Sequence, residues 1–252
     1  MTDDEALSAS ERALAQGDLT GAEQALQARW PNMAGASADG LHGFAMVRHA
    51  GGLLPEAAEL LRMAINVSPG ALRHHIALGH VLMAANDYGA AADAYAQAYR
   101  IDAKWPGLLL VYSRANYLSG RLDEAEKAAR HLLKETPSAE AWDALSNALR
   151  GQGKGEEALA AADSALKLDP HSTEALHSRG GALLALKRGQ EAHDVFEQLV
   201  ERGVSAPVLW VNRAAALQLM GRNADANAIF DDAGRRWPNM PNLQGQIAAR
   251  RK

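Results

Sequence analysis

Histidine is the side chain that most invites a chemical role in this sequence, with nine copies and no cysteine. Imidazole ligates transition metals and moves protons near neutral pH. The adjacent His74 and His75 would point about 100° apart on a helix, so they cannot share one ion. His42 and His49 lie about 10 Å apart along a helix axis. Because no two histidines stand four residues apart, the sequence predicts neither a metal centre nor a cofactor site.

Nucleophilic and phosphate-binding motifs are also missing. The sequence has no G-x-S-x-G elbow, the pattern that exposes a catalytic serine. The run Gly151-Gln152-Gly153-Lys154-Gly155 lacks the spacing and the Gly-Lys-Ser/Thr ending of a phosphate loop. A turn between two helices explains it more simply, and we expect no enzymatic site.

One alanine recurs along the chain at a nearly constant interval, and this period indicates the kind of helical units on which the histidines and other polar side chains stand. The steps between its copies are 35, 34, 34, 33, 34 and 34 residues. A period of that length is typical of stacked supersecondary units. The recurring alanines are Ala22, Ala57, Ala91, Ala125, Ala158, Ala192 and Ala226. The sequence therefore predicts an all-α solenoid spanning 1–252 as a single domain.

Taking the alanine as position 20 divides the chain into seven predicted repeats. Their ranges are 3–37, 38–71, 72–105, 106–138, 139–172, 173–206 and 207–240. Segment 241–252 is either a capping helix, with Leu243 and Ile247 on one apolar stripe, or the start of a truncated eighth repeat. A lone helix pair could not bury its apolar face, so neighbouring repeats must stack.

Two further positions support this register. Position 8 is small in every repeat: Ser10, Ala45, Gly79, Ser113, Ser146, Gly180 and Ala214. Small residues on facing helices let the helix axes approach. Position 15 is Gly or Asn in six repeats, as a left-handed turn after a helix requires. Lys187 is the exception, and we expect Gly189 to provide the turn instead.

The unit Leu72–Trp105 carries Leu78-Gly79, Asn86-Asp87-Tyr88, Ala91, Tyr95 and Ala98. With these residues the chain resembles the tetratricopeptide repeat family, in an alanine-rich bacterial style. The resemblance implies a right-handed superhelix of antiparallel helix pairs whose first helices line a concave groove. The family's two-carboxylate clamp for chaperone tails is not matched in this sequence.

If first helices line the groove, positions 2, 5, 9 and 12 share one face. We take as the candidate ligand surface His42, Met46, His49, Arg73, His80, Arg114, Tyr117 and Asn147. Methionines and long cations suit an adaptable peptide-binding wall. The alternative is that these are only solvated polar residues, with the convex face as the binding surface.

Arg179 and Arg213 occupy position 7, where other repeats mostly carry Phe, Leu or Tyr. A buried switch is one interpretation. The simpler one is that the stems pack while each guanidinium finds a carboxylate, for which Asp194 and Asp231 are the candidates.

Composition limits the remaining function classes. A formal net charge of −4 gives no electrostatic footprint for nucleic acid. The first residues are acidic where a secretory signal is basic, and no apolar run reaches membrane-spanning length. The sequence thus predicts a cytoplasmic protein without nucleic-acid or membrane partners.

We expect a non-catalytic scaffold that binds a peptide or protein segment in the groove. The alternative is the N-terminal recognition arm of a larger bacterial enzyme, of sulfotransferase or 2-oxoglutarate oxygenase type, docked on Val208, Val211 and Ala215. A third hypothesis is a homo-oligomer that forms through the terminal repeats.

Overall fold

The computed structural model describes residues 1–250, which contain α-helices, one 3-10 turn and no strand. The all-α class predicted from the sequence is confirmed. The chain divides into two compact units, Met1–Ser119 and Gly120–Lys252, which are described separately. The division falls between the two helices of the predicted fourth repeat, 106–138. One solenoid running through it stays a prediction.

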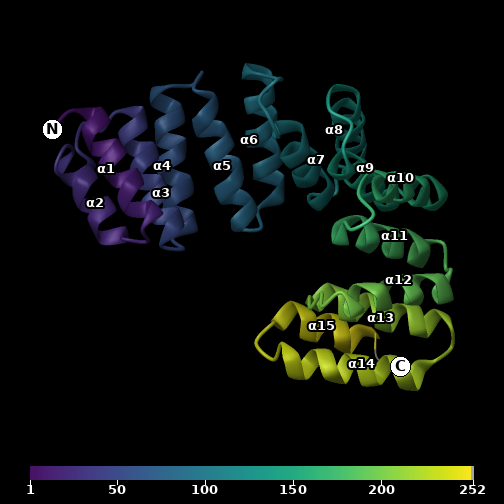
Figure 1. The fold of residues 1–252 in the computed structure, drawn as a ribbon. Coiled ribbons are helices and arrows are strands. Elements are labelled where there is room, and N and C mark those ends of the chain that lie inside the picture. Colours follow the sequence, from purple (N-terminus) through teal and green to yellow (C-terminus); the bar gives the residue numbers. More distant parts are fainter. Residues whose placement is uncertain (251–252) are drawn as a thin grey trace. The chain divides into compact units, whose positions relative to one another are not determined.

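Unit 1 is a stack of helices joined by short turns, so that sequential helices run antiparallel (Figure 1). Its elements are α1 (Asp3–Ala15), α2 (Leu19–Gln27), the 3-10 turn η1 (Pro31–Met33), α3 (Ala38–Ala50), α4 (Leu54–Val67), α5 (Leu72–Ala84), α6 (Tyr88–Ile101) and α7 (Leu108–Leu118). The odd-numbered helices are the first helices of their repeats.

Unit 2 continues the alternation and ends on an additional helix (Figure 1). Its elements are α8 (Leu122–Glu135), α9 (Ala139–Gly151), α10 (Gly155–Leu168), α11 (Thr173–Ala185), α12 (Gly189–Glu201), α13 (Pro207–Leu219), α14 (Asn223–Arg236) and α15 (Pro241–Arg250). Leu243 and Ile247 of α15 are buried, so this helix covers apolar surface as a cap does. The last two residues of the predicted segment 241–252 lie outside the described range.

Helix ends follow local side-chain chemistry. Thr2 and Glu5 form a reciprocal capping box at the start of α1. Ser37, Ser138 and Ser172 each accept a hydrogen bond from the backbone three residues ahead, at the starts of α3, α9 and α11. Each cap satisfies an N–H that the helix leaves unpaired and is typically worth about 1 kcal/mol.

The turn within each repeat is left-handed at position 15, including the two that lack glycine, at Asn86, with φ of 60°, and at Lys187. Gly52, Gly120 and Gly153 have φ of 76°, 79° and 78°, and Lys187 has φ of 58°. The expectation that Gly189 replaces Lys187 in this role is wrong. Gly189 is the buried first residue of α12, and a Cβ there would lie 2.9 Å from Leu219 of α13 and 3.0 Å from the Ala216 carbonyl oxygen. Close packing explains Gly189, and Lys187 makes the turn itself.

Small residues at positions 8 and 20 set the spacing within each repeat. All seven position-20 alanines have no exposed surface. A Cβ on Gly79 would lie 2.4 Å from the Tyr95 ring, and one on Gly180 would lie 2.4 Å from the Phe196 ring. The ring at position 24 thus occupies the volume that a side chain at position 8 would need.

The two arginines at position 7 are held by carboxylates, but not by the predicted ones. Arg179 Nε lies 2.8 Å from Asp163, and a terminal nitrogen of Arg213 lies 2.6 Å from Glu197. Both carboxylates stand sixteen residues earlier, on the second helix of the preceding repeat. Asp194 and Asp231 were wrong candidates because the contact is made between repeats.

Candidate functional site

The first-helix face of unit 1, defined by positions 2, 5, 9 and 12 of α3, α5 and α7, carries seven of the eight predicted site residues. His42, Met46 and His49 lie on α3, Arg73 and His80 on α5, and Arg114 and Tyr117 on α7. Asn147 lies on α9 in unit 2. Asn147 is therefore described separately, and the face consists of residues of unit 1.

One end of the face holds a histidine pair that sequence reasoning missed. The Nδ1 atoms of His42 and His74 are 3.1 Å apart, and one ring must donate to the other. His74 Nε2 lies 3.5 Å from an Asp39 carboxylate oxygen, and Arg73 forms an ion pair with the same carboxylate. The signal was available: residues 32 apart fall on adjacent first helices of a 34-residue repeat.

Burial keeps this histidine pair neutral. His74 has no exposed surface, and burial, followed by the neighbouring His42, lowers its pKa from 6.5 to about 4. Burial also lowers the pKa of His42, against a smaller opposing effect of Glu11. His75 turns elsewhere, with Nε2 2.8 Å from the Pro69 carbonyl oxygen. The adjacent histidines thus point apart, as their spacing predicts.

The other end of the face is a strip of basic side chains. Burial, followed by the nearby His49, lowers the pKa of His80. The His80 ring meets the buried Tyr95 ring edge-on, with centroids 5.7 Å apart. Burial raises the pKa of the Tyr95 phenol, and the positive charge of Arg114 on α7 opposes this with a smaller lowering effect. Tyr95 therefore connects His80 of α5 with Arg114 of α7, and His49 of α3 joins the strip through its effect on His80.

Apolar surface accompanies these polar groups. Met46 is half-buried and packs against the core of unit 1, and Tyr117 is also half-buried. Arg114 is exposed, and His80 stays exposed in part although its ring packs on Tyr95. The face thus combines anchored apolar side chains with solvated polar heads, an arrangement that suits binding.

Asn147 belongs to an internal polar network of unit 2. Its Nδ2 donates to Asp143 and to the Ser178 hydroxyl at 3.1 Å, while Arg150 donates to its Oδ1 at 3.1 Å. Ser178 donates in turn to Asp143 at 2.5 Å. These bonds tie α9 to α11, so Asn147 already has a structural role.

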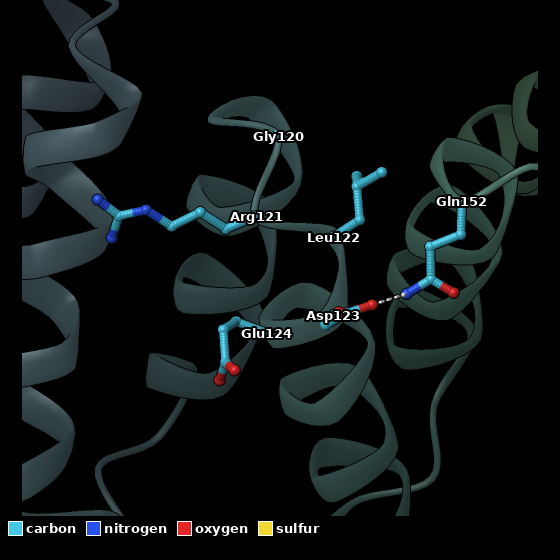
Figure 2. A pocket seen from close by; sticks show the side chains of 6 residues that line it. All are labelled: Gly120, Arg121, Leu122, Asp123, Glu124 and Gln152. Carbon is cyan, nitrogen blue, oxygen red and sulfur yellow. Dashed lines mark hydrogen bonds between the residues drawn. The ribbon is translucent and has the colours of Figure 1, made fainter.

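An open depression in unit 2 is lined by none of the predicted site residues (Figure 2). Its lining is Gly120, Arg121, Leu122, Asp123, Glu124 and Gln152. The Gln152 side-chain amide donates to Asp123 at 3.0 Å (Figure 2).

Within residues 1–250 no group of three or more His, Cys, Asp or Glu side chains is arranged to hold a metal ion. No helix in that range is long and apolar enough to span a bilayer.

Comparison with known proteins identifies the family. One tetratricopeptide repeat model matches residues 43–108 and 144–207, and a second matches residues 82–148. The chain belongs to the tetratricopeptide repeat family. The resemblance inferred from the Leu72–Trp105 unit is therefore confirmed.

Solved tetratricopeptide repeat structures share this fold. A protein from Parabacteroides merdae is 15% identical, with a TM-score of 0.83 over 97% of both chains. A thermophilic protein from Thermus thermophilus is 23% identical, with a TM-score of 0.63 over 71% of this chain and 98% of that one. A chain of the APC/C hetero-tetramer Cut9-Hcn1 has a TM-score of 0.68 over 99% of this chain and 49% of its own, at 14% identity. At these identities the likeness shows the fold alone.

A curated relative of the tetratricopeptide repeat chain is the human protein O-mannosyl-transferase TMTC1. The two are 24% identical over 176 residues, which cover 68% of this chain. The chain spans 20% of the length of that relative. The likeness is therefore limited to a small part of the human protein.

Proposed function

We propose that this chain is a non-catalytic scaffold that binds a segment of a partner protein on the first-helix face of unit 1. The observation that carries the proposal is the continuity of that face. His42 on α3 meets His74 on α5, Arg73 pairs with Asp39, and His80 is electrostatically coupled to His49. Neighbouring first helices thus present one joined surface and not separate polar patches.

Family membership supports a binding role. A repeat stack offers a long, regular surface because each repeat contacts only its neighbours. One structural neighbour, a chain of the Cut9-Hcn1 hetero-tetramer, was solved in complex with a protein partner. The cytoplasm is the compartment we propose, since a chain without cysteine has no need of an oxidising environment.

The face also has the composition of a binding surface. A few aromatic, methionine and arginine anchors supply most of the energy of a protein interface. Met46, Tyr117 and Arg114 are of these kinds, and they lie on two first helices of the same unit. We therefore expect binding to depend on a few of these side chains and not on the whole face.

The test replaces two anchors and leaves the fold intact. Arg114→Glu combined with Tyr117→Ala should weaken capture of a partner from the native lysate at least tenfold, because it removes an aromatic contact and reverses a charge. The helical circular dichroism signal should stay unchanged. Arg100→Glu is the matched control, because Arg100 is exposed on α6, a second helix of the same unit. Equal capture by the double variant and the control would remove the first-helix face from the account.

A second candidate function is a recognition arm of a larger enzyme, of the sulfotransferase or 2-oxoglutarate oxygenase type. It is favoured by the curated relative, a transferase by name, of which this chain spans only 20%. The predicted docking face is smaller than expected, because Val211 is buried and only Val208 is strongly exposed. A reading frame that continues past Lys252 into a folded domain would support this candidate, and a stop codon there would remove it.

Self-association through the terminal repeats is a separate hypothesis, which light scattering over a concentration range tests.

A further inference from the structure

The first-helix face of unit 1 has a one-sided charge. Helices α5 and α7 contain no aspartate or glutamate, and α3 contains only Asp39. Asp39 is already engaged by Arg73 and lies next to His74. The permanent positive charges of the face are those of Arg73 and Arg114, and His42, His49 and His80 contribute imidazoles. Because Asp39 offsets Arg73, Arg114 carries the remaining positive charge of this face, although the whole chain has a formal net charge of −4.

Arg114 stands out among the arginines of unit 1. Its guanidinium has no hydrogen bond or ion pair to any described residue, and its side chain is exposed. The other arginines of the unit each have a partner in the structure: Arg12, Arg29, Arg48, Arg62, Arg73 and Arg100. An unpaired guanidinium keeps all five donors available for a carboxylate from outside.

The basic strip around Arg114 is continuous. His49 and His80 likewise lack a hydrogen bond or ion pair to described residues, and His80 is coupled to His49. Tyr95 lies beneath, in ring contact with His80 and under the electrostatic influence of Arg114. Its hydroxyl is buried without a partner. No carboxylate of the described unit is paired with His49, His80 or Arg114, so the charge of the Arg114 guanidinium is uncompensated.

We propose that the partner segment bound by this face is an acidic peptide, whose carboxylates pair with Arg114 and accept hydrogen bonds from His80 and His49 while its apolar side chains contact Met46 and Tyr117. Charge complementarity supports this occupant, because opposite charges steer association and select partners. A neutral or basic segment would leave Arg114 without a partner. This inference rests on the proposed function and specifies the chemistry of the ligand.

The experiment selects peptides without assuming their charge. A random peptide library is displayed against the full chain, and the recovered sequences are then measured by fluorescence anisotropy. We expect enrichment in aspartate and glutamate next to apolar residues. For one recovered peptide, changing its acids to the matching amides should abolish most binding. Raising the ionic strength from about 0.1 M to about 1 M should weaken it, because the Debye length falls from about 10 Å to about 3 Å.

Variants locate the carboxylates on the face. Arg114→Gln should weaken an acidic peptide about two- to fivefold, the range expected for one exposed ion pair. Adding His49→Gln and His80→Gln should weaken it further. Arg100→Gln on α6 is the control and should change little. Acidic peptides that bind the Arg114→Gln and Arg100→Gln variants equally would overturn the inference.

Two outcomes separate this inference from the proposed function. Recovered peptides without acidic bias, whose binding is still lost in Tyr117→Ala, would overturn the acidic ligand and leave the binding face in place. Peptides whose binding is unaffected by every variant of the face would overturn the proposed function itself. A single-stranded oligonucleotide that competes as well as the acidic peptide would also overturn the inference, because it would indicate a general polyanion surface.

Discussion

At position 8 of the third repeat, the missing side chain of Gly79 lets the Tyr95 ring lie directly against α5. A Cβ there would approach three ring atoms at 2.4–2.7 Å. The same relation holds between Gly180 and Phe196. The distance between the two helices of a repeat is therefore set by single residues.

Gly79→Ala should lower the free energy of unfolding by about 1–3 kcal/mol, the usual cost of overpacking a core. Gly89→Ala is the control, because Gly89 lies in α6 of the same repeat with nothing within 4 Å of a Cβ. The Gly89→Ala replacement should raise the free energy of unfolding by up to about 1 kcal/mol, because alanine has a higher helix propensity than glycine. Urea denaturation measures both, and a loss of similar size at the two sites would contradict the packing described here.

Lys187 carries a conformational cost that the glycine turns avoid. Its φ of 58° is a left-handed conformation that disfavours an L side chain by about 1–2 kcal/mol. Lys187→Gly should therefore stabilise the chain by about 0.5–1 kcal/mol, after allowing for the greater freedom of glycine in the unfolded state. The same replacement at Lys167, exposed in the last turn of α10, should destabilise it. If the Lys187→Gly variant unfolds at the same temperature as the parent chain, the left-handed backbone at Lys187 costs no stability.

At the scale of the elements, the sequence predicted the helices better than the contacts between repeats. First helices begin at Ala38, Leu72, Ala139, Thr173 and Pro207, where the alanine register begins the repeats. Local sequence patterns are enough to predict where a helix begins and ends, because helix caps and left-handed turns depend on only a few neighbouring residues. The predicted salt-bridge partners of Arg179 and Arg213 were wrong, because the actual carboxylates lie across a repeat interface.

The candidate site shows the same limit. Periodicity placed seven of its residues on first helices of unit 1. It did not reveal that His42 would face His74, because the two rings stand on different helices and meet only through packing between repeats. Nor did it show that Asn147 would be held by its neighbours within unit 2. Which side chains remain available to a ligand depends on packing that a repeat register alone does not give.

Contact between α3 and α5 should make the chain sensitive to acid. The pKa of His74 is lowered from 6.5 to about 4 by burial, so the unfolded chain binds more protons between those values. Its contribution to stability is therefore complete above pH 6.5 and is lost as the pH falls toward 4, on the order of 3 kcal/mol. The lowered pKa values of His42, His80 and His177 act in the same direction.

His74→Gln isolates this contribution. Glutamine can still form a hydrogen bond but does not titrate. The free energy of unfolding of the variant should fall less between pH 7 and pH 4 than that of the parent chain. His131→Gln is the control, since His131 pairs with Glu135 on α8 in a partly exposed position. A parent-like pH profile in the His74 variant would show that this histidine does not contribute to acid sensitivity.

At the scale of the whole molecule, function depends on which face of the repeats meets the partner. Each unit presents first and second helices alternately along the chain. The second helices of unit 1 carry their own ion pairs, such as Arg62 with Glu59. The first-helix face instead leaves Arg114 without a hydrogen bond or ion pair to described residues. Our proposal that the first helices form the recognition surface and the second helices support it rests on this difference.

Site-specific photo-crosslinking tests this assignment most directly. A photoreactive amino acid is placed at position 80 on α5, at position 114 on α7 or at position 100 on α6, each an exposed site of unit 1. With a peptide recovered by display, positions 80 and 114 should form crosslinks and position 100 should not. Crosslinks from position 100 that equal or exceed those from the first helices would contradict the account.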